Sequence, residues 1–198
     1  LAKGASILAE LFPDLYPKLA QDGALLLSAS DIAWYHFGVW KLPYPEPLQS
    51  SFESRPFLEQ HVRSRLADRD NVHIIDACEV TKLCENHGRI TGVHLRYRTE
   101  EQREQDLAAD LVVDASGRGS RSPQWLASLG YGNVEESNLK VAVGYSTRIY
   151  RIPEQPPSSW KMLIVYGTPP VDKRGGLILP MEGGYWMLTL VGLAGDYP

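Results

Sequence analysis

A short apolar segment, Leu111–Val113, runs directly into a glycine turn and limits the folds open to this chain. Its β-branched, apolar residues are typical of a strand that is buried on both faces. Gly117 and Gly119 allow backbone angles closed to other residues, and Ser122–Pro123 provide the start of a helix over Gln124–Leu129. A strand, turn and helix in this order aim backbone N–H groups at one point, which suits a phosphate or a ribose edge. The alternative is that the glycines serve the geometry of the turn alone.

The composition argues against several classes of function. Of the 198 residues, 43% are apolar and 22% are charged, as in globular proteins that fold in water. The net charge is −4 and the basic residues are scattered, so we expect no nucleic-acid partner. We also expect no transmembrane segment and no signal peptide. Cys78 and Cys84 fall on one predicted strand and its exit, which is awkward for a mutual disulfide, so we expect a cytoplasmic protein.

The N-terminal part of the sequence predicts a helix and then an aromatic strand. Apolar residues recur at helical spacing through Leu1–Ala20, without a capping residue in front of them. Ile32–Trp40 alternates as one two-sided strand or a pair of strands, and prolines within residues 43–47 impose an extended link. Because the sequence begins inside a helix and ends directly after a strand at Leu188–Gly195, we expect it to be a piece of a longer protein.

A second helix is predicted to open at Ser54, with a proline in its first turn. Leu58, Val62 and Leu66 give this helix one apolar stripe that should face a core. Arg55 falls at the helix start, where the helix dipole disfavours a cation. Its position indicates an anionic ligand nearby, and the alternative is an exposed, solvated arginine.

Two groups of strands are predicted beyond this helix. Val72–Leu83 and Ile90–Arg98 read as a hairpin around the turn Asn86–Gly88, and the chain then returns through Asp106–Asp114 as a buried strand. Later segments alternate or run at strand length between proline and glycine turns, which predicts a four-stranded antiparallel sheet. These segments are Leu139–Ile149, Trp160–Tyr166, Gly176–Met181 and Tyr185–Leu193.

No metal site and no catalytic acid or base is indicated by the sequence. The five histidines lie on different predicted elements at spacings that match no ligand set. The hydrolase motif G-x-S-x-G is absent, and neither Ser116 nor Ser120 has an evident base. Gly117-x-Gly119-x-x-Ser122 imitates a dinucleotide fingerprint, but the helix after it is too short for a crossover.

Taken together, the motifs resemble the middle of an FAD-dependent monooxygenase of the p-hydroxybenzoate hydroxylase fold. The matching segments are S-R-P-F-L-E-Q-H-V-R at 54–63, C-E-V-T at 78–81, the hairpin I-T-G-V and D-L-V-V-D-A-S-G-R-G-S-R at 110–121. The resemblance implies that Arg55 lies against the FAD pyrophosphate or ribose and that the backbone of Val80 passes the adenine. It also implies that Ser116 and Gly117 belong to the second flavin motif, usually A-D-G-x-x-S, in which Ser116 replaces an aspartate. The family's N-terminal G-x-G-x-x-G and later G-D motif are missing from this sequence.

The resemblance implies an α/β (α+β) fold in which part of an FAD-binding, Rossmann-like layer carries an antiparallel substrate-domain sheet. Residues 1–31 would form a helix and linker of the FAD layer, and residues 32–53 a substrate-side strand and proline-rich link. Residues 54–134 would form the FAD-binding portion, and residues 135–198 the substrate sheet. Tyr145, Trp186 and Trp34 are the predicted lining of a pocket for a small apolar or aromatic substrate.

The implied reaction is reduction of FAD by NAD(P)H followed by oxygen insertion into the substrate. A flavin reductase or halogenase on the same fold is an alternative that oxygen uptake coupled to product would distinguish. A non-enzymatic binding module is another, which a flavin-free protein would favour. Because the pyrophosphate loop is missing, we expect this chain alone to be inactive and to hold no flavin. It should compensate for exposed strand edges by self-association or by local disorder near its ends.

Overall fold

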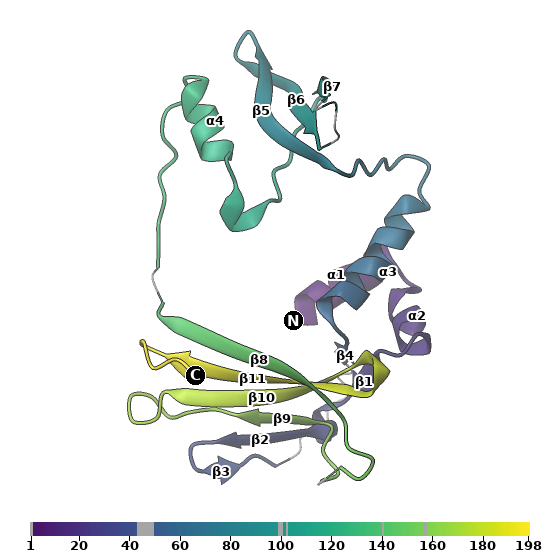
Figure 1. Ribbon diagram of the computed structural model, residues 1–198, viewed down its shortest axis with the longest axis vertical. Helices are drawn as coiled ribbons and strands as arrows, with labels where there is room; N and C mark the ends of the chain where they lie inside the picture. Colours follow the sequence, from purple (N-terminus) through teal and green to yellow (C-terminus); the bar gives the residue numbers. More distant parts are fainter. Residues whose placement is uncertain (1, 43–49, 99–100, 102, 140, 157) are drawn as a thin grey trace. The chain divides into compact units, whose positions relative to one another are not determined.

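The structure is a computed structural model that describes residues 2–42, 50–98, 101, 103–139, 141–156 and 158–198 (Figure 1). It consists of two compact units. The large unit contains residues 1–72 and 140–198, and the small unit contains residues 73–139. The four-part functional division made from the sequence stays a prediction, and the proline-rich link at 43–47 lies outside the described residues.

Three helices of the large unit enclose a small apolar core. They are α1 (Ala2–Leu11), α2 (Leu15–Gln21) and α3 (Arg55–Ala67). The prediction of one helix over residues 1–20 is wrong, because the helix breaks before Pro13, and the residue that precedes a proline is disfavoured in helical conformation. Phe12, Leu15, Leu19 and Ala24 are buried, and the predicted stripe of α3 packs against them. The core-facing stripe of α3 is therefore confirmed.

A six-stranded sheet forms the rest of the large unit, in the order β3-β2-β9-β10-β11-β8. All neighbours are antiparallel except β2 and β9, which are parallel. The predicted antiparallel sheet of four strands is confirmed, and Ile32–Trp40 forms the pair of strands that joins its edge. The strands are β2 (Ile32–His36), β3 (Val39–Trp40), β8 (Val143–Arg151), β9 (Met162–Val165), β10 (Arg174–Met181) and β11 (Tyr185–Leu193).

Helix α3 is tied to this sheet at its N-cap residue, Ser54. The Ser54 hydroxyl accepts a hydrogen bond from the backbone N–H of Phe57 at 3.3 Å, as an N-cap does. Glu182 lies in the short 3₁₀ helix η3 (Glu182–Gly184) between β10 and β11, and its carboxylate accepts from the Ser54 backbone N–H at 2.7 Å and from the Ser54 hydroxyl at 2.5 Å. Nearby, β1 (Leu25–Leu27) pairs with β4 (Ser50–Phe52), and η1 (Ala29–Asp31) leads into β2.

The small unit is built on a three-stranded antiparallel meander. Its strands are β5 (Cys78–Asn86), β6 (Arg89–Tyr97) and β7 (Glu104–Ala108), in the order β5-β6-β7. The predicted turn is confirmed, with positive φ angles of 50° at His87 and 77° at Gly88 that suit a two-residue hairpin. Strand β5 begins later than the predicted Val72, because Ala77 takes a positive φ of 53° that interrupts an extended chain. Both cysteines lie on β5 as free thiols.

The segment Leu111–Val113 does not form the buried strand predicted for it. Leu111 and Val113 are 78% and 77% exposed, and no described strand pairs with the segment. A strand buried on both faces needs partners on both edges to satisfy its backbone groups, and the described residues supply none. The predicted turn forms as η2 (Gly117–Gly119), and the predicted helix forms as α4 (Ser122–Ser128), which begins earlier than expected, with Arg121 at the N-cap position. The mixed α/β class with an antiparallel sheet is confirmed. No described helix is long and apolar enough to cross a membrane.

Candidate functional site

Two of the four predicted cofactor-binding residues come together in the small unit. Val80 and Ser116 line one cavity of about 380 Å³, and Gly117 lies in the same turn beside Ser116. Arg55 belongs to the large unit and does not contribute to this cavity.

The cavity has apolar walls and one polar end. Strands β5 and β6 supply one wall, the exposed segment before the turn supplies another, and α4 supplies an indole ring. The apolar lining consists of Val80, Leu83, Val93, Val112, Val113, Ala115 and Trp125. The polar end is formed by Asp114, Ser116, Arg121 and Ser122. A planar, weakly polar group with an attached hydrogen-bonding group matches this arrangement.

Asp114 organises the turn at the polar end. Its carboxylate accepts from the Ser116 backbone N–H at 2.9 Å, the Ser116 hydroxyl at 2.5 Å, the Ser120 hydroxyl at 2.7 Å and the Ser122 hydroxyl. These hydrogen bonds hold the pKa of the Asp114 carboxyl far below its ordinary value. The bond from the Ser116 hydroxyl contributes most, followed by those from Ser122 and Ser120. Asp114 is therefore ionised at neutral pH, and its four donors fix the conformation of the Ser116–Gly117 turn.

A charged network stands beside the turn. The Glu79 carboxylate accepts from the Arg96 guanidinium at 2.9 Å and also from that of Arg121. The hydrogen bond from Arg96, followed by that from Arg121, lowers the pKa of Glu79. The guanidinium carbon of Arg121 lies 5.6 Å from the centre of the Trp125 ring. Two cations share one carboxylate here, and the ionised Asp114 carboxylate lines the same cavity, so these four charges sum to zero.

Arg55 lies at the start of α3 with an exposed side chain. Its guanidinium donates to the Glu59 carboxylate at 2.6 Å, and its side chain is 87% exposed. This hydrogen bond raises the pKa of Arg55. An anionic ligand at Arg55 would have to compete with Glu59, and the predicted contact to FAD stays a prediction.

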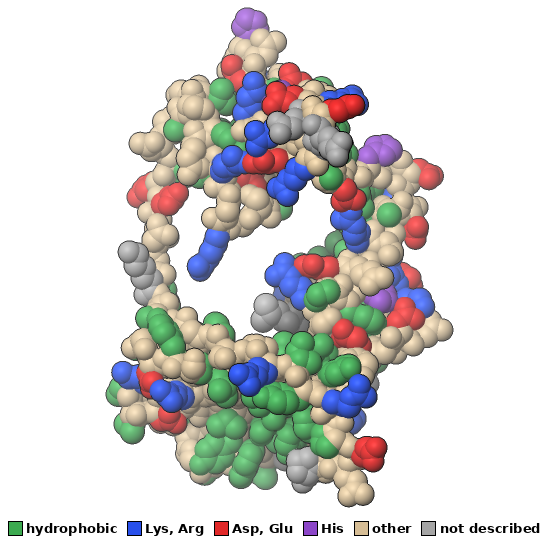
Figure 2. Space-filling view, viewed as in Figure 1, with side chains coloured by type: hydrophobic (Ala, Val, Ile, Leu, Met, Phe, Trp, Pro, Cys, Tyr) green, Lys and Arg blue, Asp and Glu red, His purple; other side chains and the backbone are tan. Residues whose placement is uncertain are grey.

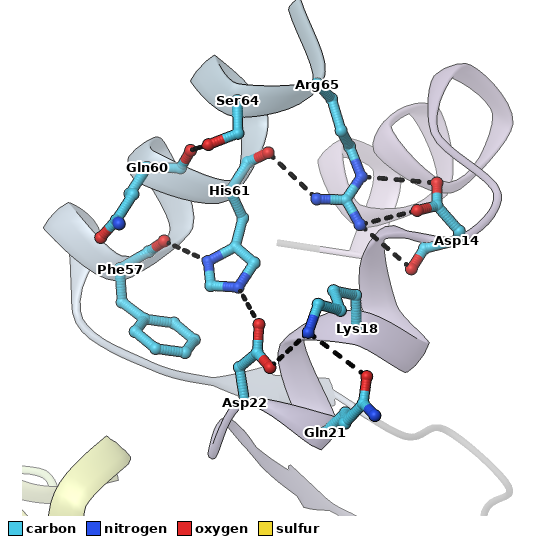
Figure 3. Close-up of polar contacts among 9 residues, drawn as sticks. All are labelled: Asp14, Lys18, Gln21, Asp22, Phe57, Gln60, His61, Ser64 and Arg65. Carbon is cyan, nitrogen blue, oxygen red and sulfur yellow. Dashed lines mark hydrogen bonds and ion pairs between the residues drawn. The ribbon is translucent and has the colours of Figure 1, made fainter. Parts of the chain in front are cut away.

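A second polar cluster joins α2 and α3 (Figure 3). Arg65 donates to Asp14 at 2.8 Å, and Lys18 donates to Asp22 at 2.6 Å. The Nδ1 and Nε2 atoms of His61 lie 2.8 Å from the Phe57 carbonyl and 2.9 Å from the Asp22 carboxylate. The hydrogen bond from Arg65 lowers the pKa of Asp14, and those from Lys18 and then His61 lower that of Asp22. The contacts Arg65–Asp14 and His61–Asp22 join α3 to the two ends of α2, and we assign the cluster a structural role.

The substrate pocket predicted to be lined by Tyr145, Trp186 and Trp34 stays a prediction. Trp186 stacks on Trp160 at 5.7 Å between ring centres, and Trp34 lies edge-on to Tyr166 at 5.7 Å. Tyr145 is 69% exposed on β8. Two cavities of the sheet, of about 310 and 380 Å³, are lined in part by Gly175 and Gly176 of β10.

The site contains donors and walls for a ligand but shows no nucleophile held by a base. Among the described residues, no group of three or more His, Cys, Asp or Glu side chains could hold a metal ion. Asp114 and Trp125 were not predicted as site residues, whereas Arg121 ends the turn that resembles the second flavin motif. The signal for Asp114 was present in the sequence, since serines follow it at positions 116, 120 and 122.

Comparisons with known proteins agree with the fold. No family model matches the chain. The chain is 31% identical to Protein Rv3254 of Mycobacterium tuberculosis over 207 aligned positions, which span all of the chain and 43% of that protein.

Three solved structures share the fold at low sequence identity. The flavin-dependent brominase Bmp2 gives a TM-score of 0.61 at 15% identity, over 95% of this chain and 44% of that one. The myxobacterial chondrochloren halogenase CndH gives 0.60 at 16% identity, over 90% of this chain and 40% of that one. PqsL of Pseudomonas aeruginosa, a probable FAD-dependent monooxygenase, gives 0.56 at 13% identity, over 89% of this chain and 45% of that one. The chain spans less than half the length of these proteins, and its fold is one found within FAD-dependent halogenases and monooxygenases.

Proposed function

We propose that this chain is part of an FAD-dependent oxidoreductase, in which the small unit holds the adenosine half of the cofactor. The observation that carries the proposal is the cavity that brings Val80 and Ser116 together beside Gly117. These residues lie on separate segments of the sequence, and the resemblance assigns all three to one cofactor. Their meeting at one cavity supports a common ligand.

The lining fits the adenosine part of FAD. Apolar walls that include Val80 and Trp125 suit a purine, and polar groups at one end suit a ribose. The guanidinium of Arg121 lines the cavity and is a suitable hydrogen-bond donor for a neighbouring phosphate. A cavity of about 380 Å³ is near the lower end for ligand pockets, so the rest of FAD would need further residues. Arg55 is our proposed contact to the pyrophosphate or ribose.

When bound and reduced by NAD(P)H, FAD supplies the electrons that activate O₂ for insertion into a small apolar or aromatic substrate. The residues of this chain bind and orient the cofactor. Asp114 fixes the turn through its four donors, and Glu79 positions Arg121 above Trp125. We assign no catalytic acid or base.

The test uses the natural-length protein that contains this chain. It should purify with visible flavin absorbance, close to one FAD per chain, and should consume O₂ when NADH or NADPH is added. Substrate that raises NAD(P)H oxidation and is recovered with one added oxygen atom identifies a monooxygenase. Oxidation of NAD(P)H without product points to a reductase. A flavin-free protein with no affinity for FAD would contradict the proposal and favour a binding module.

A flavin-dependent halogenase is the second candidate, since two of the structures that share the fold are a brominase and a halogenase. The same assay with chloride or bromide separates the two activities. A halogenated product that requires the halide supports this candidate, and a hydroxylated product that forms without halide refutes it. A cytoplasmic location, and the absence of flavin from the 198-residue chain alone, remain proposals to be checked by fractionation and by absorbance.

A further inference from the structure

We propose that His61 forms a pH-sensitive tie between α2 and α3, which is strong while its imidazole ring carries two protons and weakens when one of them is lost. His61 lies in the middle of α3 and contacts Asp22, the C-cap residue of α2 (Figure 3). Figure 2 shows charged side chains of both signs gathered over the helices of the large unit. The proposal concerns these helices only and does not depend on the flavin site.

Both nitrogen atoms of the His61 ring face oxygen atoms that can only accept a hydrogen bond. Nδ1 lies 2.8 Å from the carbonyl oxygen of Phe57, one turn earlier on α3. Nε2 lies 2.9 Å from an oxygen of the Asp22 carboxylate. A backbone carbonyl and an ionised carboxylate have no hydrogen to donate, and a neutral imidazole has only one N–H. Both contacts are therefore hydrogen bonds only when the ring carries two protons.

The two oxygen atoms of Asp22 serve different donors. Lys18 donates to Oδ1 at 2.6 Å, whereas His61 faces Oδ2. The hydrogen bond from Lys18, followed by that from His61, lowers the pKa of Asp22, so this carboxylate is ionised at neutral pH. Because each oxygen has its own donor, Lys18 does not take the place of His61 in the tie.

The charged groups around the ring come from both helices. Arg65 donates to the His61 carbonyl oxygen at 3.0 Å and to the Asp14 carboxylate at 2.8 Å. The charged residues that line one cavity with His61 are Asp14, Lys18, Asp22, Arg65 and Asp68. Three carboxylates and two cations give this cavity a formal charge of −1, so an imidazolium at His61 brings the sum to zero.

The His61 ring is packed closely enough for a lost hydrogen bond to matter. Its side chain is 12% exposed, and its ring centre lies 4.5 Å from that of Phe57, so water has little access to replace a partner. When the ring loses one proton, one nitrogen presents a lone pair to an oxygen atom, and an attractive contact becomes a repulsive one. If Nδ1 keeps its proton, the contact that is lost is the one that joins α3 to α2.

Protonation of His61 should therefore stabilise the folded protein. The folded state favours the ring with two protons, whereas a histidine in the unfolded chain loses one of them at about pH 6.5. The contribution of His61 to the free energy of unfolding is fully present below this pH and is lost as the pH rises above it.

Urea unfolding of the natural-length protein at about pH 5.5 and about pH 8.5 tests this dependence. His61→Gln keeps a polar side chain but removes the titrating ring, and it should raise the unfolding equilibrium constant about tenfold more at the lower pH than at the higher one. His73→Gln, at an exposed histidine, is the matched control and should show no such difference. In an Asp22→Asn background, which removes the charged acceptor, the effect of His61→Gln should lose most of its pH dependence.

Nitrogen-15 labelling of histidine gives a second readout by nuclear magnetic resonance, which requires no variant. At about pH 5.5 the ring that contacts Phe57 should show two N–H signals protected from exchange with water, and one of them should disappear at about pH 8.5.

Either of two results would overturn the inference. One is an effect of His61→Gln that is equal at the two pH values, and the other is a His61 ring that shows fewer than two protected N–H signals at about pH 5.5. Circular dichroism checks that each variant is folded. If His61→Gln or Asp22→Asn is not, the ring signals of the natural protein decide the matter alone.

Discussion

Ser54→Ala should cost about 2–3 kcal/mol of the free energy of unfolding. The substitution removes the N-cap of α3, which is worth about 1 kcal/mol. It also removes the shorter of the two hydrogen bonds to the Glu182 carboxylate, and a hydrogen bond to a charged group is worth about 1.5–3 kcal/mol. We use the lower end of that range because Glu182 is half-exposed and, in the variant, still accepts the hydrogen bond of 2.7 Å from the backbone N–H of residue 54.

Urea unfolding of the natural-length protein, followed by circular dichroism, measures this cost. Ser64→Ala is the matched control, because it makes the same change on α3 where the hydroxyl donates only to the Gln60 carbonyl at 3.0 Å. The control should change the free energy of unfolding by less than about 0.5 kcal/mol. If Ser54→Ala costs no more than Ser64→Ala, the tie between α3 and the sheet contributes nothing and the reasoning is refuted.

The same contact predicts a pH dependence. Burial raises the pKa of Glu182, but the hydrogen bonds from the Ser54 hydroxyl and backbone outweigh it and lower the pKa below the ordinary value. A lowered pKa in the folded state stabilises the protein above the unfolded-state pKa of about 4.3, and this stabilisation is lost as the pH falls through the folded-state pKa. The difference in stability between the natural protein and Ser54→Ala should be constant from neutral pH to about pH 5 and should shrink in more acidic solution. A difference that stays constant there would contradict the assignment.

Three further predictions concern the core, the meander and the proposed cofactor contact. Leu19→Ala should cost about 2–5 kcal/mol of unfolding free energy because Leu19 is fully buried, whereas Leu11→Ala, at a residue that is 59% exposed, should cost far less. Urea unfolding compares the two variants, and equal costs would contradict the core assignment. Gly92→Ala should cost at least about 1–3 kcal/mol in the same assay, since its Cβ would lie 2.1 Å from a backbone oxygen of β7; unchanged stability would refute the packing of this meander. Arg55→Ala should raise the FAD dissociation constant about tenfold or more, whereas Glu59→Gln, which releases Arg55 from its ion pair, should not raise it. Equal FAD affinities for Arg55→Ala and the natural protein would show that Arg55 does not contact the cofactor.

Local signals in the sequence predicted most of the elements that depend on neighbouring residues. Ser54 and Pro56 marked the start of α3, and Leu58, Val62 and Leu66 marked its core-facing stripe, because capping and helical periodicity are short-range properties. The turn at His87–Gly88 was equally local. The cavity residues Val80 and Ser116 came from a resemblance between motifs and not from periodicity.

Features that depend on distant partners were predicted less well. Leu111–Val113 has the composition of a buried strand, but a strand forms only where another strand supplies hydrogen bonds, and none of the described strands does so. The pocket lining proposed for Tyr145, Trp186 and Trp34 also depends on distant partners and stays a prediction. Trp186 and Trp34 pack against the rings of Trp160 and Tyr166, and the two sheet cavities described above are lined by other residues, such as Val165 and Leu177. Sequence alternation identifies the face of a strand but not which side chains on that face line a cavity.

A titration of the natural-length apoprotein with FAD tests the central claim most directly, when it is repeated on a variant that fills the small-unit cavity. Val80→Trp places a larger ring among the lining residues, and Val134→Trp places the same ring on an exposed residue of the same unit that does not line the cavity. We predict saturable binding of one FAD per chain, weakened at least about tenfold by Val80→Trp and unchanged by Val134→Trp. FAD binding that Val80→Trp leaves intact, or no binding to the natural-length protein, would contradict the assignment of this cavity to the cofactor.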